Sequence, residues 1–466
     1  MDAPLYQKLR TYNKKGYTSF HMPVHRNGAM YDAFLRKHLL SLDYTELADT
    51  DNLANASGCI LHMHQNMADT FRADHAHLLV NGSTGGIHAM LFACLGRGEK
   101  ILLDRNVHQS VLNACLLFDL DPVYIDVRID PHMGIVSSIS AEAVAQTLSE
   151  NPDAKAVLIT SPTYFGVVSD VQKIAQAVHQ YRIPLLVDCA HGSHFAFSDR
   201  LPLLPTELGA DACVLSLHKT LGALTQTGLL LHSGSLLSWN RLQVALRLLQ
   251  TTSPSYVMMS CADYVCAYMQ ENGKPLLDVA IDRTAQFRQS LERKTNCICH
   301  YDNVYAYDPL RLVINVSHYG ITGLKAAQLL HDHFYVDVEM ADSNNIVCII
   351  SHMTRASDFK TLLHSLLSIT KDLPSVQKNL SVYALPAVEP AIRPYTAYCA
   401  DIEMIPLQAC IGRISAGNVS VYPPGVPAVF AGCRISRQAV TYICTMQKAG
   451  AVITGLCEGG LPVVSE

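Results

Sequence analysis

The sequence has few charged residues, no excess of basic residues and no long apolar run. Charged residues make up 16% of the 466-residue chain, against about 25% in an average soluble domain. Lysine and arginine number 35 and aspartate and glutamate 40, so binding to nucleic acid or to an anionic membrane has no electrostatic basis. No segment reaches the roughly 18 uninterrupted apolar residues of a membrane-spanning helix. Neither nucleic acid nor membrane is therefore an expected partner.

The first twenty residues also lack the features of an export signal. They mix charges and tyrosines where such a signal needs about 7–15 consecutive apolar residues. The fifteen cysteines are scattered and odd in number, which favours reduced thiols in the cytoplasm. The tight cluster Cys297-Ile298-Cys299-His300 has no second pair at ligand spacing, so no metal site is expected.

Apolar residues, at 49% of the chain, predict a large core and a buried subunit interface. Between residues 77 and 233, short β-branched runs alternate with stretches whose apolar residues recur every three or four positions. Such alternation is typical of a mostly parallel sheet covered by helices on both faces. The expected strands are HLLVNG (77–82), KILLDRN (100–106), PVYIDV (122–127), AVLITS (156–161), PLLVDCA (184–190), ACVLSLHK (212–219) and GLLLHS (228–233).

The composition changes after about residue 290, where shorter apolar segments predict a smaller α/β domain. A proline-containing stretch at 384–395 then leads to a last segment. We therefore expect an amino-terminal segment and large domain over 1–290, a small domain over 291–380 and a carboxyl-terminal segment over 381–466. The prolines of VYPPGVP (421–427) argue against regular structure there.

Ligands of parallel α/β sheets bind beyond the carboxyl ends of the strands, and three strand ends carry reactive groups. Asn81-Gly82-Ser83-Thr84-Gly85-Gly86 joins a strand to a helix, which makes a phosphate cup; a plain helix cap is the alternative. Asp188 closes a second apolar strand, as a functional carboxylate or as a helix-capping or salt-bridged one.

The third strand end carries Lys219, with few charges nearby. Because a buried unpaired lysine is costly, its presence there favours an amine that is deprotonated or used covalently, as in a Schiff base. A phosphate cup, a strand-end carboxylate and a strand-end lysine together match what pyridoxal 5'-phosphate requires.

The chain resembles the ornithine/lysine/arginine decarboxylase family of fold type I pyridoxal-phosphate enzymes, in a short form without the amino-terminal wing domain. The resemblance implies an aspartate aminotransferase-like α/β fold and covers nearly the whole length. Its motifs are PLYQKLRTY (4–12), SFHMPVHRNG (19–28), DYTE (43–46), LLVNGSTGG (78–86), DRNVHQSV (104–111), SPTYFGVVSD (161–170), VDCAHGSHF (187–195), SLHKTLGALTQTG (216–228), LLQTTSPSYVMM (248–259) and GRISAGNVSVYPPGVP (412–427).

The resemblance also implies residue roles. Lys219 would bind the cofactor covalently and Asp188 would hold its ring nitrogen protonated. His108 would stack on one ring face with Ala190 beneath the other, while His191 and Thr163 would lie beside the phenolic oxygen or the substrate carboxylate. The phosphate would be held by Ser83, Thr84, Gly85, Ser216 and His218.

The sequence departs from the family pattern at several positions. Val24, Arg26 and Asn27 replace a glycine, a lysine and a glycine in HMPGHKGG, and Cys189 replaces the acidic residue of DEAH. Cys433 stands where the family has a glutamate, which would be expected to pair with the distal charge of a basic substrate. Asp342, Asp401 and Glu403 are the candidate substitutes.

The expected function is decarboxylation of arginine, lysine or ornithine to an amine that feeds polyamine metabolism. Two alternatives remain open: a pyridoxal-phosphate lyase, aminotransferase or decarboxylase acting on a less basic amino acid, and a catalytically silent relative. The family resemblance also implies a homodimer or higher homo-oligomer, with the YPPGVP or SPSYVMM segment near the partner's site.

Overall fold

The computed structural model describes residues 2–301, 304–371, 373, 384–422, 425–457 and 460–465. Its centre is a seven-stranded sheet in which only β11 runs antiparallel to its neighbours. Each of the seven strands lies within or next to a predicted strand segment, so those predictions are confirmed. In spatial order the strands are β2 (His75–Leu79), β11 (Gly228–His232), β10 (Ala212–Leu215), β9 (Leu185–Asp188), β7 (Ala156–Thr160), β3 (Lys100–Asp104) and β4 (Asp121–Ile125).

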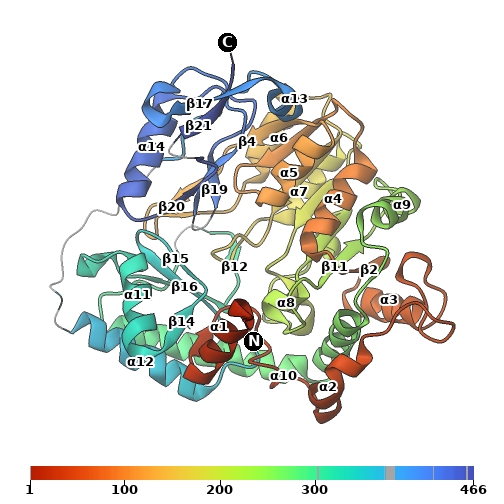
Figure 1. Cartoon of the computed structure of the whole chain (residues 1–466), viewed down its shortest axis with the longest axis vertical. Helices are drawn as coiled ribbons and strands as arrows, with labels where there is room; N and C mark the ends of the chain where they lie inside the picture. Colours follow the sequence, from red (N-terminus) through yellow and green to blue (C-terminus); the bar gives the residue numbers. More distant parts are fainter. Residues whose placement is uncertain are drawn as a thin grey trace.

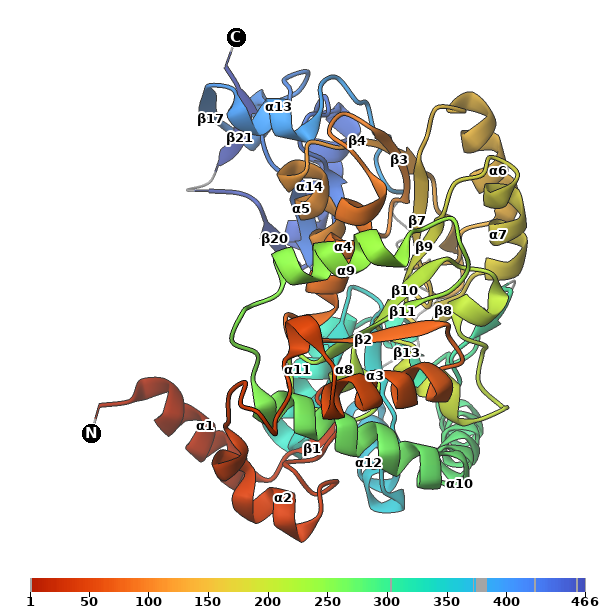
Figure 2. The ribbon, with the colours of Figure 1, turned by 90° about the vertical axis from the view of Figure 1, so that its right-hand side faces the viewer.

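Strand alternation sends successive side chains to opposite faces of this sheet, and helices cover both faces. Leu102, Val157 and Leu185 face one apolar cluster, whereas their neighbours Ile101, Leu158 and Leu186 face the other. Figure 2 shows one set of helices on one side of the sheet and a second set on the other. The first set is α4 (Gly82–Cys94), α5 (Gln109–Leu117) and α9 (Trp239–Leu249), and the second is α6 (Ala141–Glu150) and α7 (Val171–His179).

A smaller α/β domain lies beside the large one (Figure 1). Its three-stranded sheet contains β13 (Arg311–Asn315), β16 (Asn345–Ile349) and β15 (Met340–Ala341), with α11 (Gly323–Phe334) and α12 (Ala356–Thr370). The long helix α10 (Tyr256–Lys294) leads into it and passes the boundary expected at residue 290. The two expected domain boundaries stay predictions.

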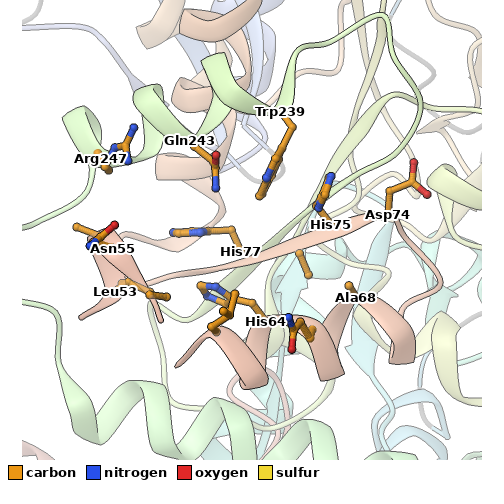
Figure 3. Close-up of a pocket in the computed structure, with 15 residues that line it drawn as sticks. Leu53, Asn55, His64, Ala68, Asp74, His75, His77, Trp239, Gln243 and Arg247 are labelled. Atoms are coloured by element: carbon orange, nitrogen blue, oxygen red, sulfur yellow. The ribbon is translucent and has the colours of Figure 1, made fainter. Parts of the chain in front are cut away.

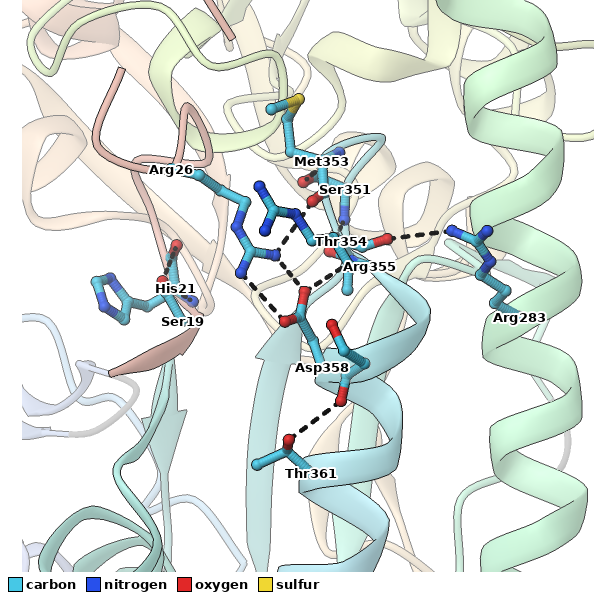
Figure 4. Close-up of polar contacts among 11 residues, drawn as sticks. Ser19, His21, Arg26, Arg283, Ser351, Met353, Thr354, Arg355, Asp358 and Thr361 are labelled. Carbon is cyan, nitrogen blue, oxygen red and sulfur yellow. Dashed lines mark hydrogen bonds and ion pairs between the residues drawn. The ribbon is translucent and has the colours of Figure 1, made fainter. Parts of the chain in front are cut away.

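The amino-terminal segment is tied to this smaller domain. Strand β1 (Thr18–Phe20) pairs in parallel with β14 (Val336–Val338). Arg26, one of the departures from the family pattern, forms an ion pair with Asp358 of α12 and donates to the carbonyl oxygen of Met353 at 3.1 Å (Figure 4). Both carboxylate oxygens of Asp358 are engaged by Arg26, so this arginine has a structural partner.

The carboxyl-terminal segment has its own apolar core and its own strands. Strand β17 (Ile402–Pro406) pairs with β21 (Gly460–Val464), and β18 (Val419–Tyr422) lies between β19 (Val426–Val429) and β20 (Val452–Thr454). The expectation of irregular structure over 421–427 is therefore wrong at Pro427, which lies in β19 beside a register shift that accommodates a residue without an N–H. Pro423 and Pro424 lie outside the described residues.

In the described part of the chain, no helix combines the length and the apolar character that crossing a membrane requires.

Candidate active site

A cavity of about 200 Å³ opens at the carboxyl ends of β3, β7, β9 and β10, the edge at which α/β sheets bind ligands. Six of the predicted site residues line it: Ser83, His108, Asp188, Ala190, His191 and Lys219. These residues come from four separate strand ends, so the tertiary fold brings together groups that the sequence spreads over more than 130 positions.

Lys219 projects into the cavity from the short helix α8 (Leu217–Thr220), directly after β10. Its Nζ lies 3.2 Å from Nε2 of His191. Burial lowers the pKa of Lys219, and the charge of Asp188 acts in the opposite direction. Burial and the positive charges of Lys219 and Arg311 hold the pKa of His191 well below its usual value. The geometry therefore favours an amine with a lowered pKa beside a neutral imidazole.

Asp188 ends β9, where its Oδ1 accepts the backbone N–H of Ala190 at 3.1 Å. Behind it lies Asp104 at the end of β3, which accepts the backbone N–H groups of Asn106 and Thr160. Burial, reinforced by the charge of Asp188, raises the pKa of Asp104 to about 7. The two carboxyl groups end strands on either side of β7 and have different environments, and Asp188 is the one that reaches the cavity.

The expected phosphate cup is built at the start of α4. Ser83 belongs to the first turn of that helix, where N–H groups and the helix dipole favour an anion. The Ser216 hydroxyl donates to the Ser83 hydroxyl at 3.0 Å, which brings the two predicted serines together. His218 is held by a contact of its Nδ1 with the Thr227 carbonyl oxygen at 2.9 Å. Thr84 and Gly85 lie in the same helical turn.

His108 and Thr163 have different positions relative to the cavity. The His108 ring is exposed at the cavity, caps α5 and contacts the Ser110 hydroxyl through Nδ1 at 2.7 Å. Thr163 is buried in the turn after β7, where its hydroxyl accepts the backbone N–H of Val167. The role expected for Thr163 stays a prediction, since its hydroxyl can still donate a hydrogen bond; its neighbour Tyr164 lines the cavity.

The carboxyl-terminal segment closes the cavity from the other side. Ser420, Tyr422, Gly425, Val426 and Thr454 line it. The YPPGVP segment thus contributes to the site of its own chain, whereas we expected it near the partner's site. This contact was not accessible to sequence reasoning, because it joins residues about 200 positions apart.

Four further residues near the site were not among those predicted from the sequence. Tyr164 donates to Glu339, which also accepts the backbone N–H of Met22 at 2.9 Å. Asp337 and Glu339 line a more open depression that shares Tyr164 and Tyr422 with the cavity. Arg311, 1% exposed, donates to Nδ1 of His191 at 2.8 Å. Two signals were present: alternation in YVDVEM places both acids on one face, and a lone arginine opens the apolar run RLVIN.

The expected replacements for the missing glutamate do not reach the cavity. Cys433 is buried against an apolar cluster on the far face of the sheet. Asp342 is half-buried in a turn, where it accepts the N–H groups of Asn344 and Asn345. Glu403 pairs with Arg413, and Asp401 is exposed. The three expected carboxylates are therefore excluded as lining groups of this cavity.

Cys189, the other departure from the pattern, packs in the core on the side away from the cavity. Its sulfur would lie 2.5 Å from a Cβ placed at Gly192, so this replacement belongs to the local packing, as strand alternation predicted.

The side chains of the Cys297–His300 cluster are engaged in packing and in an ion pair. Cys297 and Cys299 are buried, and His300 pairs with Glu292 at 2.9 Å. Among the described residues, no three histidine, cysteine, aspartate or glutamate side chains meet in a way that could hold a metal ion.

A second cavity, of about 250 Å³, lies at the edge strand β2, between α3 (Cys59–Thr70) and α9 (Figure 3). Its histidines have structural contacts. The Nε2 of His64 accepts the backbone N–H of Leu78 at 3.1 Å, and the ring of His75 stacks on Trp239. Because β2 is an edge strand, the His64 contact blocks further strand addition.

Comparisons with known proteins agree with this geometry. The family model described as Orn/Lys/Arg decarboxylase, major domain, matches residues 3–301, and the model of the C-terminal domain matches residues 377–458. The arginine decarboxylase of Halalkalibacterium halodurans is 34% identical over 97% of this chain and 95% of its own length. That of Bacillus subtilis is also 34% identical, with the same coverage. The inducible lysine decarboxylase of Escherichia coli is 22% identical over 97% of this chain and 78% of its own.

Solved structures show the same fold. The constitutive lysine decarboxylase of Escherichia coli superposes with a TM-score of 0.78 at 19% identity, covering 99% of this chain and 81% of its own. Ureidoglycine-glyoxylate aminotransferase of Bacillus subtilis matches over 74% of this chain and 93% of its own, with a TM-score of 0.57 at 12% identity. The expected fold type I architecture is thereby confirmed.

Proposed function

Because the chain belongs to the Orn/Lys/Arg decarboxylase family, we propose that it decarboxylates a basic amino acid and that arginine is the first substrate to test. The observation that carries the proposal is the meeting of Lys219, Asp188 and Ser83 around one cavity. Support for arginine comes from the arginine decarboxylases at 34% identity, since the lysine decarboxylases share only about 22%.

The residues present fit pyridoxal 5'-phosphate. Ser83 and Ser216 would hold the phosphate at the start of α4, Asp188 would face the ring nitrogen and Lys219 would bind the aldehyde carbon. When bound, the cofactor supplies an electrophilic carbon and a ring that accepts the electron pair released with CO₂. The amine of Lys219, buried beside His191, is the group whose chemistry most requires such an electrophile.

The side chains of the chain then have distinct tasks. Asp188 stabilises positive charge at the ring nitrogen, because its carboxylate is buried at a strand end and one oxygen remains available. Lys219 can take a proton and return it at Nζ. The walls supplied by Tyr422 and Val426 restrict water, which strengthens every electrostatic interaction inside the cavity.

The distal positive charge of the substrate would meet Glu339, since both oxygens of Asp337 are held by His331 and Tyr12. Glu339 has hydrogen-bond donors in Tyr164 and Met22, but no ion pair with a lysine, arginine or histidine is found for it in the described part of the chain. Its depression adjoins the cavity at Tyr164 and Tyr422. A carboxylate there would replace the one that the family has at Cys433.

We further infer a homodimer in the cytoplasm that supplies amines to polyamine metabolism. Helix α1 (Pro4–Lys15) buries none of its residues and extends from the body of the chain (Figure 2). Its Leu5, Tyr6 and Leu9 are 72, 61 and 58% exposed, which favours burial against a second copy. All fifteen cysteines are unpaired, as suits a reducing compartment. Light scattering of the purified protein tests the dimer.

The decisive experiment incubates the purified protein and pyridoxal phosphate with single amino acids and analyses the products by mass spectrometry. The expected result is an amine lighter than arginine by one CO₂, absent with Lys219→Ala. If only lysine or ornithine yields an amine, that amino acid is the substrate in place of arginine, and the reaction type stands. Product from a less basic amino acid would support the lyase or aminotransferase alternative. No product from any amino acid would favour a silent relative and reject the proposal.

A further inference from the structure

Arg311 is a buried cation for which no ion pair is found in the described part of the chain. It does not line the cavity, and no described residue forms a hydrogen bond with its buried Nε and Nη1. The nearby carboxylate of Asp308 pairs with His194. Burying a guanidinium in this way costs free energy, so the position has to be explained by the contact that Arg311 does make.

That contact fixes the proton of a neighbouring imidazole. Nη2 of Arg311 lies 2.8 Å from Nδ1 of His191. A guanidinium can only donate, so Nδ1 must accept and the neutral ring must carry its proton on Nε2. Nε2 in turn lies 3.2 Å from Nζ of Lys219. With Nε2–H as the donor, Nζ accepts through a lone pair that only an uncharged amine has.

We propose that Arg311 is a positioning residue, which fixes the Nε2–H tautomer of His191 and thereby presents Lys219 as an uncharged nucleophile. The inference rests on the proposed function only in taking Lys219 as the reacting amine. Arg311 acts through His191 and touches neither the cavity nor its contents.

The surrounding structure holds Arg311 in place. A Cβ at Gly166, which has a φ of +86°, would lie 2.5 Å from Cβ of Arg311, so the turn packs directly on the arginine. The ring of Tyr164 lies 5.9 Å from the guanidinium. Arg311 belongs to β13 of the smaller domain, whereas His191 follows β9 of the large domain. The tautomer of His191 therefore depends on the two domains being seated together.

Other groups also influence the charge of Lys219, and the test has to separate them from Arg311. The positive charge of Arg311 itself favours the uncharged amine, independently of any tautomer. The remaining charged and titratable groups that influence Lys219 or His191 are Asp188, Glu339, His108 and His218.

The first measurement uses the wild-type full-length chain labelled with ¹⁵N-histidine, without cofactor and again loaded with pyridoxal phosphate. The His191 signals are assigned by their loss in His191→Asn. We expect a bare, acceptor nitrogen at Nδ1 and a protonated nitrogen at Nε2 at pH 8. The opposite tautomer, or a doubly protonated ring, in the cofactor-free chain would overturn the proposal.

The second measurement follows acetylation of Lys219 against pH in the cofactor-free chain by mass spectrometry, with the exposed Lys8 as internal control. Arg311→Met has no donor, Arg311→Gln keeps a neutral N–H donor and Arg311→Lys keeps donor and charge. In Arg311→Met, which removes the donor, acetylation of Lys219 at pH 8 is expected to be at least about ten-fold slower than in the wild type. A ten-fold change corresponds to a shift of one pKa unit. Circular dichroism checks that each variant is folded.

Arg311→Gln and Arg311→Lys are expected to react more like the wild type than Arg311→Met does. Equal loss in Arg311→Gln and Arg311→Met would mean that charge alone matters and would refute the tautomer. If Arg311→Met does not fold, the wild-type NMR spectrum together with Arg311→Gln and Arg311→Lys still tests the proposed tautomer of His191. A reactive Lys219 with the expected tautomer, in a protein that yields no amine, would reject the proposed function and leave this inference standing.

Discussion

Replacing His64 should remove part of the acid sensitivity of the fold. This histidine is 8% exposed, and its Nε2 accepts the backbone N–H of Leu78 on the edge strand β2. Burial lowers its pKa to about 4, with the charge of Asp51 acting in the opposite direction. Protonation would turn the acceptor nitrogen into a donor facing another donor, so the folded chain resists the proton.

The magnitude follows from the difference between the folded and unfolded states. Unfolded His64 takes up a proton near pH 6.5 and folded His64 only near pH 4. Between these values the unfolded state binds more protons, so the free energy of unfolding falls as the pH is lowered. From pH 7 to pH 5 this one group should cost about 2 kcal/mol.

The assay is urea denaturation of the wild type and His64→Gln at pH 7 and pH 5, at one protein concentration. A glutamine oxygen can still accept the N–H of Leu78, but it does not titrate. We expect His64→Gln to lose about 2 kcal/mol less than the wild type on acidification. His62→Gln, on the exposed side of the same helix, should behave as the wild type does. Equal losses in wild type and His64→Gln would refute the reasoning.

Three other substitutions test the site and its support. Asp188→Asn should lower kcat about 100-fold or more, the scale of one preorganised electrostatic interaction, in steady-state assays; unchanged kcat would remove Asp188 from the mechanism. Glu339→Gln should raise KM for the basic substrate about ten-fold or more, through loss of a charge-assisted contact, with kcat much less affected; an unchanged KM would exclude Glu339 as the distal group. Arg26→Met should destabilise the fold by about 3 kcal/mol, because Asp358 is left buried without its cation. Arg26→Lys, which restores the family residue, should recover most of that loss in urea denaturation; equal stability of all three proteins would show that the ion pair contributes nothing.

The sequence determined most of the local chemistry of this protein. Alternating apolar runs and helical stretches located all seven strands of the central sheet, because burial on both faces demands continuous apolar segments. The strand-end rule then singled out Lys219 and Asp188, and the hydroxyl-rich turn at Ser83 followed from its place between a strand and a helix. These signals are local, since each depends on residues within a few positions of one another.

The tertiary structure decided which side chains lie at the cavity and which residues contact one another. Tyr422 reaches the cavity of its own chain, Glu339 adjoins it, and the proposed candidates Asp342, Asp401 and Glu403 lie elsewhere. The Thr163 hydroxyl accepts the backbone N–H of Val167 in the turn after β7. Arg311 shows the limit most clearly, for it acts on His191 across a domain boundary and 120 positions of sequence. Such contacts depend on how two separately formed domains pack, and no pattern of neighbouring residues records that packing.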